Sequence, residues 1–148
     1  MGFFVAHPNI RRPLSILKEV GLDYIQLGQP ANSLSGGESQ RLKIAKELSA
    51  AGQQKSTLYI LDEPTTGLHF REIEMLMKVL HRLIDNGGSV IVVEHNLDVI
   101  LGSDYIIDLG PEAGKMGGQI VASGPPAEII KVKKSLTGQY LKKYIERQ

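Results

Sequence analysis

The chain has 148 residues, about the size of one domain, and its 42% hydrophobic content is enough for a core. Its 17 basic and 16 acidic residues are interspersed and leave a net charge of +1, so no strong electrostatic field toward nucleic acid or a membrane is evident. With no cysteine, the chain forms no disulfide and no cysteine-ligated zinc site, so we expect no zinc in it and a reducing, cytoplasmic location. The apolar start at residues 2–6 is too short for a signal-peptide core or a membrane span, and no membrane partner is expected.

The first predicted helix covers residues 9–20. Its apolar residues recur at helical spacing: Ile10, Leu14, Leu17 and Val20. Gly21 follows as a residue that commonly ends a helix. The segment after it, Leu22–Pro30, contains Gly28 and is predicted to be a loop.

A second helix is predicted from the stretch LSGGESQR at residues 34–41. Ser35 followed three residues later by Glu38 forms a capping box, so a helix begins there. Gly36 and Gly37 leave backbone N–H groups open to close approach, and the helix dipole favours an anion at this end. The alternative is that the two glycines only punctuate a loop before an ordinary amphipathic helix.

The face that this second helix buries is predicted from its apolar residues. Leu42, Ala45 and Leu48 form the expected stripe. The basic residues Arg41, Lys43 and Lys46 are expected on other faces of the helix.

The stretch LYILDEPTTGLH at residues 58–69 begins with four apolar residues, as in a strand buried on both faces of a parallel sheet. Asp62 and Glu63 follow, and Pro64 ends the strand because it cannot donate to a sheet ladder. Ligands of open α/β sheets collect at the carboxyl ends of strands. There one acid can hold a metal that bridges phosphates while its neighbour polarises an attacking water. The alternative is an apolar strand that precedes two solvated acids.

The next predicted elements are a helix at Phe70–Leu83, closed by Asn86-Gly87-Gly88, and an apolar strand at residues 90–93. His95 then emerges at the carboxyl end of this strand, on the rim where Asp62 and Glu63 are expected. A neutral imidazole can hydrogen-bond a phosphate or the attacking water there. A histidine satisfied by a backbone carbonyl is the alternative.

The last part of the chain is predicted to contain two strands, at residues 105–109 and 119–122, around a glycine-rich turn. Two helices are predicted after them, at residues 127–134 and 136–147. They carry five lysines: Lys131, Lys133, Lys134, Lys142 and Lys143. These lysines either contact a DNA backbone or form solvated helix faces.

Three motifs in one order produce a family resemblance: LSGGE, YILDE and the histidine after SVIVVE. They resemble the signature, the Walker B motif with its glutamate, and the switch histidine of the ATP-binding cassette (ABC) ATPases. Within that class TTGLH, GGESQRLKIAKELS, EHNLDVI, IIDLGPEAG and TGQYLKKYI resemble UvrA, the damage-recognition subunit of the bacterial UvrABC excinuclease. ABC transporters usually have Asp where this chain has His69, which disfavours a transporter subunit.

Two departures from the family pattern stand out. No Walker A loop, G-x-x-x-x-G-K-[ST], occurs in the chain, and GPEAGKM at 110–116 is rejected as an imitation because its spacing is one residue short. The glycine-rich stretch of UvrA is interrupted by Ala113, Lys115 and Met116, and its zinc-binding cysteines are missing. The chain therefore looks like the C-terminal portion of an ABC nucleotide-binding domain over residues 1–148. Its parts would be a signature helix at 33–51, a Walker B region at 58–69, a switch-histidine region at 89–96 and C-terminal strands and helices at 104–148.

The resemblance implies an α/β, incomplete ABC-ATPase core, P-loop NTPase-like, with a mostly parallel sheet from which the P-loop strand is absent. It implies ATP and Mg²⁺ as cofactors, with Asp62 holding Mg²⁺ through water, Glu63 as general base and His95 at the γ-phosphate. Ser35, Gly36, Gly37 and Glu38 would bind the nucleotide of a second ABC cassette across an interface.

The further partners implied by the resemblance are damaged double-stranded DNA and a UvrB-type protein. A transporter-type subunit and a docking module without hydrolytic activity are the alternatives. Because the P-loop is missing, we expect the chain by itself neither to bind ATP tightly nor to hydrolyse it. We also expect the strands near residues 90–95 and 105–109 to lack their normal partner, so that the chain is marginally stable and prone to associate.

Overall fold

The computed structural model describes residues 4–50, 56–110 and 117–147. The chain divides into two compact units, Met1–Glu94 and His95–Gln148, and each is described by itself. The N-terminal unit contains α1 (Pro8–Glu19), the short 3₁₀ helix η2 (Ala31–Ser33), α2 (Gly36–Ala50), β1 (Leu58–Asp62), α3 (Phe70–Asp85) and β2 (Ser89–Val93). The C-terminal unit contains α4 (Leu97–Leu101), β3 (Ile106–Gly110), β4 (Gln119–Gly124), α5 (Pro126–Ile129) and α6 (Leu136–Ile145). No helix among the described residues is long and apolar enough to cross a membrane.

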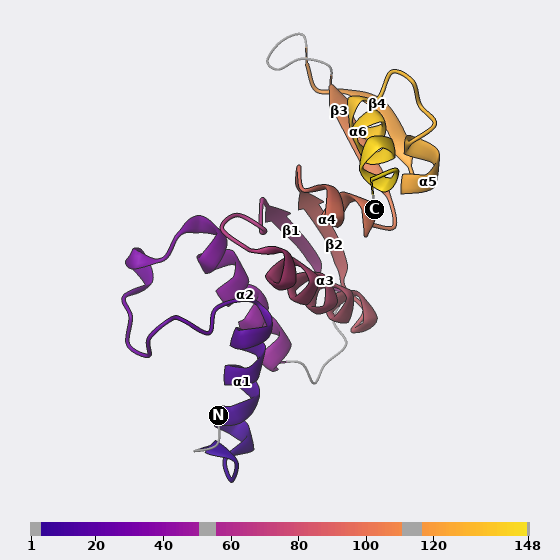
Figure 1. The fold of residues 1–148 in the computed structure, drawn as a ribbon. Coiled ribbons are helices and arrows are strands. Elements are labelled where there is room, and N and C mark those ends of the chain that lie inside the picture. Colours follow the sequence, from indigo (N-terminus) through magenta and orange to yellow (C-terminus); the bar gives the residue numbers. More distant parts are fainter. Residues whose placement is uncertain (1–3, 51–55, 111–116, 148) are drawn as a thin grey trace. The chain divides into compact units, whose positions relative to one another are not determined.

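The sheet of the N-terminal unit consists of β1 and β2, which pair in parallel from Leu58 opposite Ser89 to Asp62 opposite Val93. Helix α3 connects the two strands, as the sequence predicts, and packs against β2 (Figure 1). Helix α3 ends where Asn86 caps it and Gly87 takes a φ of 86°, a left-handed conformation that suits glycine. The predicted closure by Asn86-Gly87-Gly88 is therefore confirmed.

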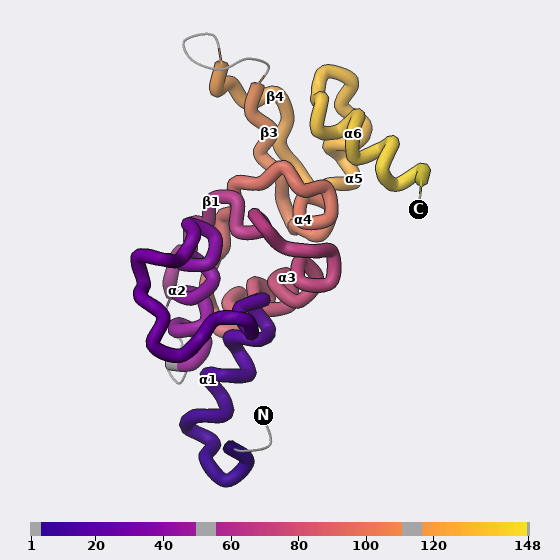
Figure 2. Tube along the Cα trace, turned by 60° about the vertical axis from the view of Figure 1, so that its left-hand side comes forward, coloured from indigo at the N-terminus to yellow at the C-terminus, as the bar shows by residue number. Residues whose placement is uncertain are grey.

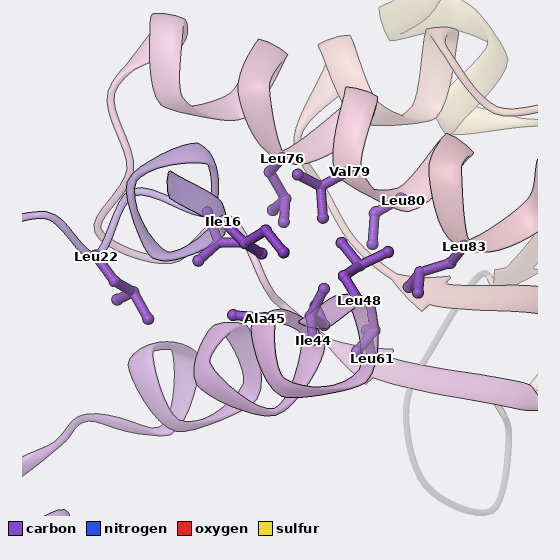
Figure 3. Close-up of a cluster of buried hydrophobic side chains, with 11 residues drawn as sticks. Ile16, Leu22, Ile44, Ala45, Leu48, Leu61, Leu76, Val79, Leu80 and Leu83 are labelled. Carbon is purple, nitrogen blue, oxygen red and sulfur yellow. The ribbon is translucent and has the colours of Figure 1, made fainter. Parts of the chain in front are cut away.

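The core of this unit lies between the helices and one face of the sheet. Helix α1 contacts α2 and α3 (Figure 2), and side chains from these helices form one buried cluster with Leu61 of β1 (Figure 3). The buried cluster comprises Ile16, Val20, Leu22, Ile44, Ala45, Leu48, Leu61, Leu76, Val79, Leu80 and Leu83. This packing fixes the direction of β1 and hence the place of the acids at its carboxyl end.

The opposite face of this sheet is exposed, although both strands are apolar on both faces. Leu58 and Ile60 of β1 and Ile91 and Val93 of β2 lie on it, and Ile60 is 67% exposed. The prediction of strands buried on both faces is thus wrong for this chain. The reason is that the helices of the N-terminal unit pack on the face of Leu61, and nothing described in this unit covers the other.

The buried stripe of α2 differs from the predicted one. It consists of Arg41, Ile44, Ala45 and Leu48, which share one helix face at helical spacing. Arg41 is only 2% exposed, whereas the predicted stripe residue Leu42 is 38% exposed. The expectation that Arg41 points away from the packed face is wrong. Its guanidinium is buried because it donates hydrogen bonds to the backbone carbonyls of Pro64 and Thr66 inside the unit.

The C-terminal unit is built on the antiparallel pair β3–β4, whose register shifts between Asp108 and Leu109. In the described part of the chain, strands β2 and β3 belong to separate two-stranded sheets, and the expectation about their common partner stays a prediction. The predicted glycine-rich turn falls mainly on residues 111–116, outside the described residues. The five lysines predicted on the last helices are exposed.

The helix predicted at residues 127–134 is wrong in length, since α5 covers only Pro126–Ile129. A Cβ on Gly138 of α6 would lie 2.2 Å from the carbonyl oxygen of Ile129, so α6 packs directly against the end of α5. The chain then turns, and Ser135 caps α6 by accepting from the Gly138 N–H at 2.8 Å. The close contact of the two helices leaves α5 no room to continue.

Candidate functional site

The start of α2 carries four of the predicted site residues, in the geometry of a capping box. The Glu38 carboxylate accepts from the Ser35 backbone N–H at 2.7 Å, and the Ser35 hydroxyl accepts from the Glu38 N–H at 3.3 Å. No atom lies within 4 Å of where a Cβ on Gly36 would be. The helix end is therefore fixed by its own cap while the Gly36 backbone stays open to a ligand.

Tyr24, from the loop after α1, contacts this helix end. Its hydroxyl donates a hydrogen bond to the Glu38 carboxylate. This hydrogen bond, followed by the Ser35 N–H, holds the pKa of Glu38 below its usual value. The same bond to Glu38 raises the pKa of the Tyr24 phenol. Glu38 is therefore held as a carboxylate in its capping position.

The two predicted acids lie at the carboxyl end of β1, as expected. Asp62 is the last residue of the strand and Glu63 the first after it, and both are exposed. The Glu63 N–H donates to the Val93 carbonyl of β2 at 2.9 Å. Glu63 has a φ of 44°, the only left-handed non-glycine residue in the described part of the chain. Such a conformation costs roughly 1–2 kcal/mol in an L-residue and persists only where the surroundings enforce it.

The loop after Glu63 is held by two charged side chains from outside it. The Nη1 of Arg41 donates to the carbonyl of Pro64 at 2.9 Å and to that of Thr66 at 3.2 Å. The Glu94 carboxylate accepts from the Thr65 N–H at 3.0 Å and from the Thr65 hydroxyl at 2.5 Å. The loop is thus tied to α2 on one side and to the end of β2 on the other.

The start of α2 and this loop are brought together within the N-terminal unit. A Cβ on Gly37 would lie 3.1 Å from the Arg41 Nη1 and 3.5 Å from the Thr66 carbonyl oxygen. Glycine at position 37 therefore leaves the space that the Arg41 guanidinium needs to reach the loop. His95 is exposed and is the first residue of the C-terminal unit, so it lies outside the unit that holds the other predicted site residues.

The residues at this site fit Mg²⁺ only in part. No group of three or more His, Asp or Glu side chains that could hold a metal occurs within residues 4–50, 56–110 and 117–147. Mg²⁺ in nucleotide sites binds one or two carboxylates and takes its other ligands from water and phosphate oxygens. The exposed Asp62 carboxylate fits that pattern as a single protein ligand.

Sequence reasoning missed four residues that shape this site: Tyr24, Arg41, Thr65 and Glu94. Arg41 had a detectable signal, because it lies three and four residues before Ile44 and Ala45 and so falls on their helix face. The pairing of Thr65 with Glu94 had no detectable sequence signal, because only the register of β1 against β2 brings these two residues together.

Comparison with known proteins places the chain in a family. A family model described as ABC transporter matches residues 9–66. UvrABC system protein A of Aquifex aeolicus is 58% identical over 146 residues, which are 99% of this chain and 16% of that protein. UvrABC system protein A of Bacillus subtilis is 59% identical over 147 residues, 99% of this chain and 15% of that protein.

The chain belongs to the UvrA family. The crystal structure of UvrA2 from Deinococcus radiodurans matches it with a TM-score of 0.84 and 48% identity, over 95% of this chain and 17% of that one. An ATP-binding cassette of an ABC transporter shares only the fold, with 21% identity and a TM-score of 0.53 over 90% of this chain and 50% of that cassette. The UvrA-family chain therefore has a partial ABC-ATPase fold and spans 15–16% of the length of these curated relatives.

Proposed function

We propose that this chain supplies half-sites for ATP hydrolysis to a UvrA-family ATPase that recognises damaged DNA in nucleotide excision repair. The observation that carries the proposal is that one packed unit contains both predicted parts of such a site. The capped start of α2 at Ser35–Glu38 is linked through Arg41 to the loop that follows Asp62 and Glu63. The identity to UvrABC system protein A over nearly the whole chain supports the repair context. A transporter-type subunit is not favoured.

In this proposal the acids at the end of β1 divide the work at one nucleotide. Asp62 would hold Mg²⁺ through water, and the chemistry that Mg²⁺ would supply there is neutralisation of charge on the phosphates. Glu63 either accepts a proton from the attacking water or orients that water. Its carboxylate is exposed and so can be reached by water. His95 contacts the γ-phosphate as a hydrogen-bond partner.

The start of α2 serves a second nucleotide in this proposal. Ser35, Gly36, Gly37 and Glu38 face the nucleotide of another ABC cassette, in the same protein or in a dimer partner. The open backbone at Gly36 and the positive end of the helix dipole both suit a phosphate. Damaged double-stranded DNA and a UvrB-type protein are the further proposed partners, and the cytoplasm is the proposed location.

The proposal is tested with a full-length chimera, in which this chain replaces the matching 147 residues of the Bacillus subtilis relative. Glu63→Gln in the chimera should lower the kcat of ATP hydrolysis at least a hundredfold and leave ATP binding nearly unchanged, because the lost charge acts on water. Glu74→Gln, an exposed position on α3, is the matched control and should keep the parental kcat. An inactive chimera, or a Glu63→Gln variant with parental turnover, would refute the proposed function.

A further inference from the structure

The left-handed backbone of Glu63 requires an explanation from its surroundings. A non-glycine residue at a φ of 44° relaxes unless hydrogen bonds or packing on both sides prevent it. On its N-terminal side the Glu63 N–H is bound by the Val93 carbonyl. On its C-terminal side the next residue is Pro64, whose side chain is fully buried. The conformation that aims the Glu63 carboxylate therefore depends on how the residues after it are held.

Those residues are held from two sides by opposite charges. Arg41 bridges the carbonyls of Pro64 and Thr66 with one guanidinium nitrogen, at 2.9 and 3.2 Å. Thr65 lies between these two residues, and one carboxylate oxygen of Glu94 accepts hydrogen bonds from both its N–H and its hydroxyl. Charge-assisted bonds of this kind are roughly twice as strong as neutral ones, and the buried guanidinium lies where water does not compete.

We propose that Arg41 and Glu94 are positioning residues that lock residues 64–66 and thereby hold the Glu63 carboxylate in its working direction. The proposal rests on the proposed role of Glu63 in hydrolysis. Arg41 and Glu94 act on the loop backbone and on Thr65, so their effect reaches the reaction only through Glu63. The Arg41 Nη1 also lies 3.1 Å from where a Cβ on Gly37 would be. The lock therefore connects the start of α2 to the acid at the end of β1.

This arrangement separates catalysis from nucleotide affinity. Loosening the loop lets Glu63 relax and misplaces its carboxylate, and a displacement of about 1 Å can cost roughly a hundredfold in rate. The loop itself contributes no ligand to the nucleotide in the proposed function. A weakened lock should therefore lower kcat while the KM for ATP stays near its parental value.

Thr65 offers the sharpest test, because valine removes its hydroxyl at nearly constant shape. In the full-length chimera, Thr65→Val should lower kcat about tenfold with KM within twofold of the parent, whereas Thr65→Ser should restore most of the rate. Thr57→Val makes the same change just before β1, outside the loop, and should leave both constants unchanged. Glu94→Gln keeps an acceptor oxygen but removes its negative charge, so it should lower kcat as well. The double variant should lose less than the product of the two single losses, because both changes weaken the same bond to the Thr65 hydroxyl.

The outcomes distinguish this inference from the function on which it rests. Parental turnover in Glu63→Gln would refute the proposed function. Impaired turnover in Glu63→Gln together with parental kcat in Thr65→Val would refute the lock alone. Fully multiplicative losses in the Thr65→Val, Glu94→Gln pair would likewise overturn it. A KM that rises with kcat unchanged would assign the loop to nucleotide binding instead of positioning.

Discussion

At the scale of single residues, the site depends on one local pair, Ser35 with Glu38, and on the long-range hydrogen bonds of Arg41. The Ser35–Glu38 capping box follows from a spacing of three residues and is present with both of its hydrogen bonds. Arg41 was misassigned because a charged side chain is seldom buried, and its burial is explained only by carbonyls 23 and 25 residues away. No sequence pattern near position 41 indicates those acceptors.

The Tyr24–Glu38 hydrogen bond gives a prediction about titration. Tyr24→Phe removes the largest cause of the lowered pKa of Glu38, so the pKa should rise toward its ordinary value of 4.5. Tyr105→Phe removes an exposed phenol hydroxyl in the C-terminal unit and should leave the Glu38 titration unchanged. Carboxyl ¹³C chemical shifts of Glu38 as a function of pH measure both. An unshifted titration in Tyr24→Phe would show that the hydrogen bond is not formed in solution.

The same carboxylate contributes to stability with a definite sign. Because its pKa is lowered on folding, the unfolded chain binds the proton more tightly, and stability from this group is fully present above about pH 4.5. It is lost as the pH falls through the lower pKa of the folded state. Glu38→Gln should therefore flatten the acid-side loss of stability in urea unfolding measured below pH 4.5. An acid limb that is as steep in Glu38→Gln as in the parent would contradict this assignment.

At the scale of elements, helices and strands with strong periodicity were predicted to within a few residues. Helix α3 was predicted at residues 70–83 and runs to Asp85, and the strands at 58–61 and 90–93 are each one residue longer in the structure. Helix α5 was overpredicted because its limit is set by α6, whose packing against Ile129 is a tertiary contact. Local propensity carries no information about such a contact.

Gly138 in α6 therefore gives a prediction for an element. Alanine normally stabilises a helix interior by about 1 kcal/mol over glycine. At position 138, however, the added Cβ would lie 2.2 Å from the Ile129 carbonyl oxygen, a backbone atom that cannot move alone. We expect Gly138→Ala to destabilise the chain by about 3 kcal/mol, since overpacking outweighs propensity. Gly110→Ala, whose Cβ would meet the Val121 side chain at an ordinary 3.5 Å, is the control, and urea unfolding compares the two. Equal stability of Gly138→Ala and the parent would show that α5 and α6 do not pack in this way.

At the scale of the whole molecule, the fold class was predictable and the degree of burial was not. Motif order identified a partial ABC-ATPase core, which the comparison with UvrA2 bears out. The apolar residues on both faces of β1 and β2 were interpreted as buried, but burial depends on what lies against a strand. Among the described residues of the N-terminal unit, helices pack against one face of the sheet and nothing packs against the other.

The exposed sheet face predicts that the chain associates in solution. Contiguous exposed apolar residues on a short sheet favour contact between copies. Ile60→Thr keeps a β-branched residue in β1 while removing apolar surface from a side chain that is 67% exposed, so it should reduce association. Ile145→Thr at the end of α6 is the control and should not. Sedimentation velocity at matched concentrations measures the effect. A monomeric parent with a sharply cooperative unfolding transition at high denaturant would show that the exposed face is harmless.

The hydrogen bonds that Arg41 and Glu94 make to residues 64–66 also have a consequence for how the chain folds while it is being synthesised. Arg41 leaves the ribosome before its acceptors, which follow 23 and 25 residues later, and Thr65 precedes Glu94 by 29 residues. Helices α1 and α2 can therefore begin to pack while the Arg41 guanidinium still has no acceptor, and Glu63 cannot take its final backbone conformation until β2 has emerged and paired. A translational pause that leaves residues 56–66, but not β2, outside the ribosome should therefore trap a nascent chain in which α2 is formed and the Glu63 loop is still protease-sensitive.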